Sequence, residues 1–178
     1  MNKTQLRQNL LQNRKPDKEK DRKILENLLS LKEFKEAGLV LTYVSTAQET
    51  DTHELIRKCF EAGKRVAVPV VDVHGITFYE INAFSDLSPG RFGIFEPAKT
   101  CKTVQIYENT FCVVPCLACD EKGFRLGYGK GYYDRFLAEF SGVSTALCYS
   151  CNIMQLPIEQ HDVAVDMIIT EGGVLYGR

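Results

Sequence analysis

The stretch Arg125 to Asp134, with the sequence RLGYGKGYYD, concentrates the side chains of this chain that could do chemistry. Glycines alternate at 127, 129 and 131, and a backbone without side chains can adopt positive φ angles and bring its N–H groups close to an anion. Arg125 and Lys130 add two positive charges. The stretch therefore predicts a loop that binds phosphate groups.

A helix is predicted directly after this loop. Apolar residues recur there at helical spacing, and the N-terminus of such a helix would face the same anion (Tyr132, Tyr133, Phe136, Leu137, Phe140). Asp134 falls on its first turn and offers a hard oxygen ligand for a cation that accompanies phosphates. The ordinary explanation of a bare Gly-x-Gly-x-Gly pattern is a tight strand-to-helix turn without a ligand. The flanking cations, tyrosines and acid favour the phosphate site over that explanation.

The loop matches neither common nucleotide fingerprint. Gly131 follows Lys130 where a Walker loop has Ser or Thr, and Tyr132 occupies the place of the third glycine of a dinucleotide fingerprint. Any nucleotide site here has another design.

Composition limits the number of domains, the partners and the compartment that can be expected. The chain has 178 residues, 44% of them hydrophobic, and no Gly/Ser/Pro-rich linker, so we expect a single domain spanning residues 1–178. Its 22 basic and 23 acidic residues give a net charge of -1, which provides no general attraction to nucleic acid or to an anionic membrane. A charged N-terminus, no apolar stretch of membrane-spanning length and seven cysteines at open spacing predict a cytoplasmic protein with reduced thiols.

Strands and helices alternate along the predicted order of elements. Two helices flank Pro16, a strand covers 39–45, and Asp51 begins a helix that ends at Gly63. Strands at 64–71 and 76–81 form a local hairpin, a long loop covers 84–97, and further strands lie at 111–115, 144–148 and 165–170. This order predicts a Rossmann-like, three-layer α/β/α fold with a mostly parallel sheet.

Three positions far from the loop could join a site. Lys3 and Arg7 lie one helical turn apart and could reach one polyphosphate, although a solvated helix face is the alternative. Glu49 follows the strand 39–45, at the edge where open α/β sheets bind ligands, and could equally be an ordinary loop carboxylate.

The cysteines allow a metal site. Cys116 and Cys119, and again Cys148 and Cys151, have Cys-x-x-Cys spacing, so tetrahedral zinc is a rival interpretation. The interval between the two pairs contains the whole glycine loop and its helix, and it is too long for a zinc ribbon. Cys112 and Cys116 also share one face of an apolar strand. Buried or partly buried thiols are therefore favoured.

The chain resembles the 5-formyltetrahydrofolate cyclo-ligase family, also called methenyltetrahydrofolate synthetase, along its whole length. The resemblance lies in the order and spacing of several pieces: Lys3 and Arg7, the stretch 49–52 (ETDT), 63–69 (GKRVAVP), 93–97 (GIFEP), 125–135 (RLGYGKGYYDR), and Val165-Asp166. It implies a three-layer α/β/α fold and the ATP-dependent conversion of 5-formyltetrahydrofolate to 5,10-methenyltetrahydrofolate, with release of ADP and phosphate. It also implies a cytoplasmic enzyme that uses Mg²⁺ and small-molecule substrates, and we expect a monomer.

The resemblance also implies roles for individual residues. ATP would be bound by Lys3, Arg7, Arg125, Leu126, Gly127, Tyr128, Gly129, Lys130, Gly131, Tyr132 and Tyr133, with Lys130 and Arg125 as the catalytic cations. The folate would contact Val44, Glu49 and Phe92, together with Tyr128, Gly129, Lys130, Gly131 and Tyr132. Mg²⁺ would be held by Asp134 and Asp166, directly or through water, although a strand-edge carboxylate is the ordinary explanation of Asp166.

Some positions depart from the family pattern. The family commonly has Pro-Gly-x-Ala-Phe-Asp before the loop, whereas this chain has Pro-Cys-Leu-Ala-Cys-Asp at 115–120. Val70 stands where a basic residue is frequent. Two other classes remain as alternatives: a non-catalytic nucleotide- or folate-binding module, and a sugar-phosphate isomerase or CoA transferase, for which no dedicated base or glutamyl nucleophile lies beside the loop.

Overall fold

The computed structural model describes residues 1–90, 93–105 and 107–177. Its centre is a seven-stranded sheet in the order β11-β10-β9-β6-β1-β2-β3. The strands are β1 (Leu39–Thr42), β2 (Arg65–Asp72), β3 (Gly75–Ile81), β6 (Thr110–Val114), β9 (Val143–Leu147), β10 (Met167–Thr170) and β11 (Gly173–Tyr176). The five strands from β2 to β10 pair in parallel, while β3 and β11 pair antiparallel at the two edges. The predicted mostly parallel sheet with a local hairpin is confirmed.

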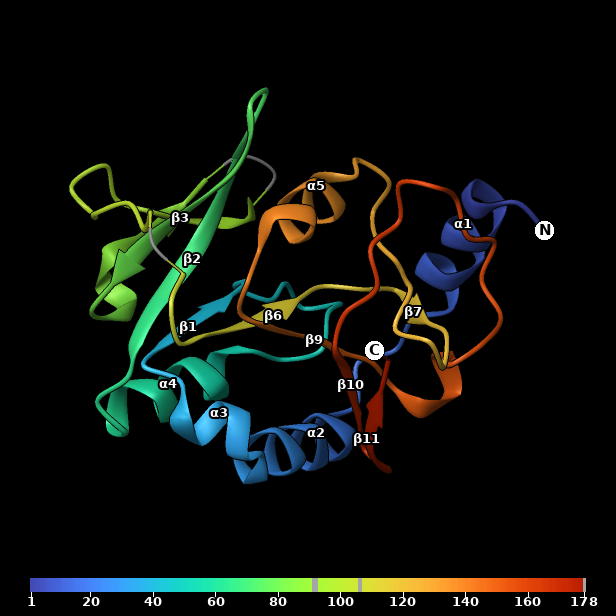
Figure 1. Cartoon of the computed structure of the whole chain (residues 1–178), viewed down its shortest axis with the longest axis horizontal. Helices are drawn as coiled ribbons and strands as arrows, with labels where there is room; N and C mark the ends of the chain where they lie inside the picture. Colours follow the sequence, from blue (N-terminus) through green and yellow to red (C-terminus); the bar gives the residue numbers. More distant parts are fainter. Residues whose placement is uncertain (91–92, 106, 178) are drawn as a thin grey trace.

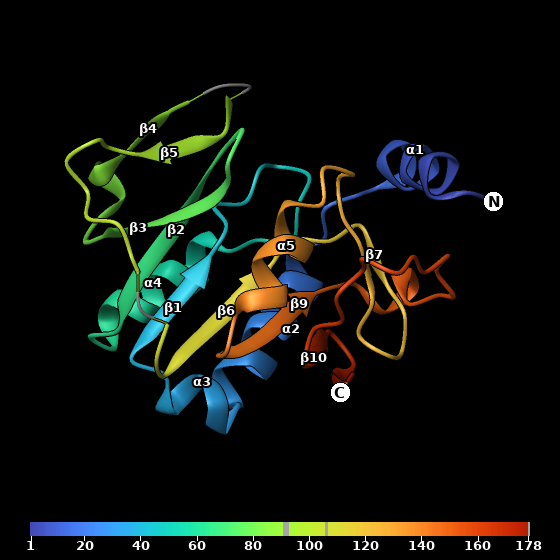
Figure 2. The same cartoon turned by 45° about the horizontal axis from the view of Figure 1, so that its top comes forward.

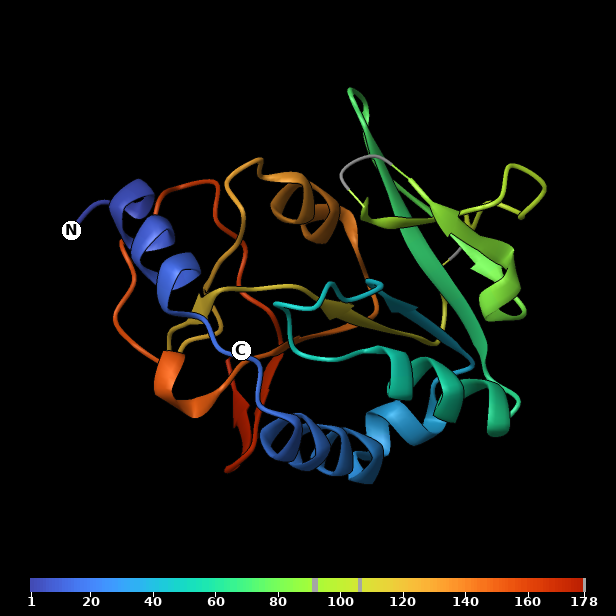
Figure 3. The ribbon, with the colours of Figure 1, turned by 180° about the vertical axis from the view of Figure 1, so that it is seen from behind.

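Helices cover both faces of the sheet (Figures 1 and 3). On one face lie α2 (Lys18–Ser30), α3 (Lys32–Glu36) and α4 (His53–Glu61), and on the other lies α5 (Tyr132–Glu139). Alternate residues of each strand supply the two cores: Val40 and Val113 pack with α2 to α4, whereas Leu41 and Cys112 pack with α5. The continuous apolar strands predicted from the sequence are therefore buried on both sides, as parallel sheets require.

The helix α1 (Lys3–Asn13) stands apart from these layers (Figure 2). It contains no buried residue, and Asn2 caps it through the N–H of Gln5. The chain breaks at Pro16, as predicted, and the Asp17 side chain accepts hydrogen bonds from Glu19 and Lys20 at the start of α2. None of the described helices combines the length and the apolar character needed to span a bilayer.

Three parts of the predicted element order need correction. The first strand ends at Thr42 instead of Ser45, because the Thr52 hydroxyl accepts from the Ser45 N–H and donates to the Tyr43 carbonyl. The predicted loop 84–97 contains a short helical turn, η1 (Phe84–Asp86), and a small sheet of β4 (Leu87–Pro89) and β5 (Phe95–Pro97), visible at the upper edge in Figure 2. The edge strand β11 was not predicted.

The connection from β6 to β9 carries the glycine loop. It passes through a small antiparallel pair, β7 (Ala118–Cys119) and β8 (Arg125–Leu126), then the loop and α5, before β9 returns beside β6. A crossover of this kind places its loops at the carboxyl ends of the parallel strands, where open α/β sheets form their sites.

Candidate functional site

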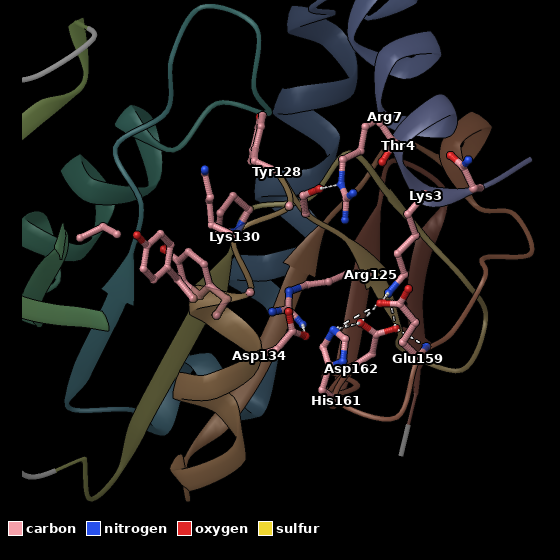
Figure 4. A pocket seen from close by; sticks show the side chains of 18 residues that line it. Lys3, Thr4, Arg7, Arg125, Tyr128, Lys130, Asp134, Glu159, His161 and Asp162 are labelled. Carbon is pink, nitrogen blue, oxygen red and sulfur yellow. Dashed lines mark hydrogen bonds and ion pairs between the residues drawn. The ribbon is translucent and has the colours of Figure 1, made fainter. Parts of the chain in front are cut away.

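One cavity of about 430 Å³ gathers residues from three distant parts of the chain. Its walls come from the start of α1, from residues 125 and 127–134, and from 159, 161 and 162, with Val71 and Pro115 at strand ends. Figure 4 shows these side chains converging from α1, the glycine loop and the segment before β10. The structure thus places Lys3, Arg7, Arg125 and Lys130 around one cavity.

The glycine loop needs two of its glycines for backbone reasons. Gly129 has φ 98°, and Gly131 has φ 65° and caps α5. A Cβ added at Gly129 would lie 3.2 Å from Cζ of Arg7. The bare backbone therefore lets the loop turn tightly into α5 and lets the Arg7 guanidinium lie against it.

Arg7 and Lys3 project from one side of α1 toward the cavity. Arg7 Nε donates to the carbonyl of Gly127 at 2.8 Å. Lys3 Nζ donates to Asp162 Oδ2 at 2.6 Å and to Glu159 Oε2 at 2.9 Å. Partial burial alone would lower the pKa of Lys3, but these two carboxylates outweigh it and raise the pKa. The ammonium is therefore held charged at the cavity wall.

Arg125 is more deeply placed than its expected role suggests. Its side chain is 3% exposed, lies 3.3 Å from Asp134 Oδ1 and donates to the Val163 carbonyl at 2.9 Å. Asp134 Oδ1 in turn accepts from the Val163 N–H at 3.2 Å. The pair fixes the segment before β10 against the first turn of α5, and both side chains line the cavity.

Lys130 and Tyr133 complete the loop side of the cavity. Lys130 is exposed and lies well apart from Lys3 in Figure 4, so the two ammonium groups stand at different ends of the site. The Tyr133 hydroxyl is buried and has no hydrogen-bond partner among the described residues, and burial raises its pKa well above the usual value. It is a neutral phenol with unused hydrogen-bonding capacity beside the cavity.

Glu49 joins the loop from the opposite side. Its carboxylate accepts from the Tyr128 hydroxyl at 2.9 Å and from the Thr46 N–H at 2.8 Å. Partial burial and the charge of Glu49 raise the pKa of Tyr128. Thr46 lines a second cavity of about 380 Å³, which also contains Val44 and Phe95. Glu49 therefore connects a residue of one cavity to a residue of the other through its two hydrogen bonds.

Among the described residues, four predicted ones do not line the main cavity: Val44, Glu49, Leu126 and Asp166. Leu126 is 1% exposed and belongs to the core beneath the loop. Asp166 accepts at Oδ2 from the N–H and the hydroxyl of Ser144, at 2.8 and 2.7 Å, at the start of β9. Val44 lines the second cavity instead. Phe92 lies outside the described residues.

An acidic wall formed by Glu159, His161 and Asp162 was not predicted from the sequence. These side chains line the cavity, and their ligand atoms lie within 4.8 Å of one another. Burial opposes the shift, but hydrogen bonds from Lys3 and from the Glu159 N–H lower the pKa of Asp162. The available signal was the cluster of Glu, His and Asp in a short polar segment just before a buried strand.

Cys112, Cys116, Cys119 and Cys148 are buried, as predicted, whereas Cys151 is exposed.

Known proteins resemble this chain in sequence and in fold. Residues 1–171 match the model of the 5-formyltetrahydrofolate cyclo-ligase family. The 5-formyltetrahydrofolate cyclo-ligase of Mycolicibacterium smegmatis is 32% identical over 182 residues, which covers 94% of this chain and 93% of the relative. The enzyme of that name from Escherichia coli K12 is 31% identical over 146 residues, covering 78% and 80%.

A solved structure gives the same answer in three dimensions. The NMR structure of Aquifex aeolicus 5,10-methenyltetrahydrofolate synthetase superposes with a TM-score of 0.87 and 34% identity, covering 100% of this chain and 94% of that one. The chain therefore belongs to the 5-formyltetrahydrofolate cyclo-ligase family.

Proposed function

We propose that this protein is a 5-formyltetrahydrofolate cyclo-ligase, which uses ATP to convert 5-formyltetrahydrofolate to 5,10-methenyltetrahydrofolate. The observation that carries the proposal is the single cavity in which Lys3 and Arg7 of α1 meet the glycine loop 127–131. Its relatives bear the same enzyme name along most of their length.

The reaction requires positioned positive charge, which this cavity provides. The N-formyl oxygen is a poor leaving group, so ATP first phosphorylates it and leaves as ADP. The N10 amine then attacks the activated carbon, the ring closes and phosphate departs. Phosphoryl transfer depends mainly on positioning and positive charge, and no covalent protein nucleophile is required.

We assign the phosphates to the glycine loop, the N-terminus of α5, Lys130, Lys3 and Arg7. The loop N–H groups and the helix N-terminus are ready anion donors. Lys3 would exchange part of its contact with Glu159 and Asp162 for the nucleotide. Arg125, which is buried against Asp134, would act by holding Asp134 and the loop base in place.

Mg²⁺ is the expected companion of the phosphates, and the donor set of the cavity fits it. Asp134, Glu159 and Asp162 supply carboxylate oxygens at the wall, and Mg²⁺ favours one or two carboxylates together with phosphate and water. Asp134 is our first ligand. Asp166, which accepts hydrogen bonds from Ser144 and does not line the cavity, stays a predicted second ligand. The ion would neutralise the charge that develops on the transferred phosphoryl group.

The folate is assigned to the side of the cavity where Tyr128 contacts Glu49. Glu49 and Tyr128 present polar groups to a pterin, and the second hollow beside Val44 offers apolar surface. We propose that the folate extends from the glycine loop past Glu49 toward that hollow, with Phe92 as a further contact.

We further propose a single catalytic domain that acts as a monomer in the cytoplasm. The seven cysteines, all free thiols in the structure, support a reducing compartment.

An absorbance assay of methenyltetrahydrofolate formation tests the function directly. Purified protein with ATP, Mg²⁺ and 5-formyltetrahydrofolate should give the methenyl product and one ADP for each product formed. Folded protein that turns over no substrate would falsify the proposal. Calorimetry separates the alternative, because binding of ATP or folate without ADP release identifies a non-catalytic binding module.

A further inference from the structure

Three of the seven cysteine thiols converge at the base of the glycine loop. The Sγ atoms of Cys116, Cys119 and Cys148 all lie within 4.8 Å of one another, with 3.6 Å between Cys116 and Cys119. Their residues are 3%, 0% and 2% exposed. None of the three belongs to the nucleotide cavity described above.

The sheet register explains why residues so far apart in sequence meet. β6 and β9 are parallel neighbours, and Val114 pairs with Ala146. Cys116 and Cys148 each follow two residues later, so both lie just past the carboxyl ends of adjacent strands. Cys116 Sγ donates to the carbonyl of Leu147 at 3.2 Å. The long interval between the two Cys-x-x-Cys pairs, which disfavoured a metal site in the sequence, is therefore a crossover connection between two neighbouring strands.

The spacing of the sulfurs suits a metal ion. Three thiolates about 2.3 Å from a common ion lie roughly 3.8–4.0 Å apart, close to the 3.6 Å between the sulfurs of Cys116 and Cys119. Soft thiolate ligands select d¹⁰ ions such as Zn²⁺ and Cu⁺ over Mg²⁺ or Ca²⁺. Within the described residues no other His, Cys, Asp or Glu joins the cluster, and Cys151 is exposed outside it.

We propose that Cys116, Cys119 and Cys148 bind one thiophilic d¹⁰ metal ion, Zn²⁺ or Cu⁺, through three thiolates. The guanidinium of Arg14 contributes nearby positive charge, since its Nη1 donates to the Cys116 carbonyl at 3.1 Å. This charge offsets part of the negative charge that three thiolates bring into an apolar site.

The ion would be structural. Cys119 pairs with Arg125 across β7 and β8, and Pro115, next to Cys116, lines the nucleotide cavity. A bound ion would therefore tie the ends of β6 and β9 to the strand pair that leads into the glycine loop. It would contact neither ATP nor folate.

Metal titration of the reduced, full-length, untagged protein tests the proposal. Zn²⁺ and Cu⁺ are added separately against a competing chelator, and at least one of them should bind at one ion per chain. Cys148→Ser should weaken that binding by roughly 100-fold or more, because a hydroxyl is a poor ligand for a soft ion. Cys112→Ser is the matched control, since Cys112 is equally buried on β6 but lies outside the cluster.

Two readouts keep the test valid if Cys148→Ser folds poorly. Wild-type protein should melt roughly 5 °C or more higher with saturating metal. Co²⁺ should produce thiolate-to-cobalt charge-transfer absorbance in wild type and in Cys151→Ser. Absence of competitive binding by both ions, unchanged affinity in folded Cys148→Ser, or loss of binding in Cys151→Ser would each overturn the three-thiolate site.

Discussion

Gly127 and Gly129 are two residues apart in one loop, but their backbone conformations differ. Gly129 has φ 98° and would place a Cβ 3.2 Å from Arg7, whereas a Cβ added at Gly127 would meet open space, and Gly127 is not among the positive-φ glycines. Gly129→Ala should lower the free energy of unfolding by about 2 kcal/mol, because an L-residue is strained in that conformation. Gly127→Ala should change it by less than about 0.5 kcal/mol. Chemical denaturation of both variants measures the difference, and equal effects would show that the loop is not strained at 129.

Lys130 tests the charge of the loop separately from its shape. Its side chain is exposed and has no ion-pair partner among those found in the described residues, so Lys130→Ala should leave the melting temperature within about 2 °C. Turnover should fall at least about 100-fold if the ammonium stabilises the transferred phosphoryl group. Lys122→Ala, an exposed lysine outside the cavity, is the control. Parallel losses of stability and activity in Lys130→Ala would assign the residue to folding instead.

Asp134 and Asp166 can be told apart by their Mg²⁺ dependence. Asp134→Asn should raise the Mg²⁺ concentration needed for half-maximal turnover by roughly tenfold or more, because it removes a carboxylate from the cavity wall. Asp166→Asn should show the same shift if Asp166 is a ligand. A lower melting temperature with an unchanged Mg²⁺ requirement would instead restrict Asp166 to its contact with Ser144. Chelation of Mg²⁺ should stop turnover in every variant.

At the scale of elements, α1 is attached by polar contacts more than by burial. It contains no buried residue, and Lys3 and Arg7 form its hydrogen bonds to the other walls of the cavity. A helix held in this way opens more readily than one packed into a core. Because Lys3 and Arg7 are also the proposed phosphate ligands, nucleotide binding and docking of α1 should be coupled.

Asp162→Asn measures how strongly the acidic wall holds α1. The pKa of Asp162 is lowered, so its stabilising contribution is present above the ordinary carboxyl range, near pH 4, and is lost as the pH falls through its folded value. At pH 7 the variant should speed amide exchange in α1 by roughly fivefold, equivalent to about 1 kcal/mol. Glu159→Gln should have less effect, because its side chain is 54% exposed against 11% for Asp162. Unchanged exchange in Asp162→Asn would mean that other contacts hold the helix.

Over the whole molecule, the parts that could be predicted from the sequence were those with long apolar runs or clustered glycines. The strands now seen as β1, β2, β6, β9 and β10 have buried residues in continuous runs, which single-sequence patterns show well. β11 is partly exposed at the edge of the sheet, and β4 and β5 have three residues each. None of these three strands therefore shows a periodic pattern in the sequence. The glycine loop was found from its residue types, whereas Lys3 and Arg7 were found from their spacing of one helical turn and from the resemblance to the family.

The rest of the site depends on register and crossover geometry, which spacing in sequence does not show. Glu159 and Asp162 reach the cavity only because residues 163–165 are fixed against Asp134 and Gly123. Cys116 meets Cys148 only because β6 and β9 are neighbours in the order of the sheet. Asp166, predicted from resemblance, lies against Ser144 because β10 pairs with β9 at that point.

Removal of α1 should separate folding of the molecule from nucleotide binding. A chain lacking residues 2–13 loses Lys3 and Arg7 but no buried side chain of α1, so it should lose only the helical circular dichroism of α1 itself and still melt cooperatively. In the intact protein, ATP at 100 times its dissociation constant should add about 2.7 kcal/mol to the free energy of unfolding. The shortened chain should lose most of this gain, because the remaining Lys130 and glycine loop bind the phosphates from one side only. The Lys3→Ala/Arg7→Ala double variant, with α1 retained, should lose it to a similar extent. Full ATP stabilisation of the shortened chain would show that the nucleotide is held without α1.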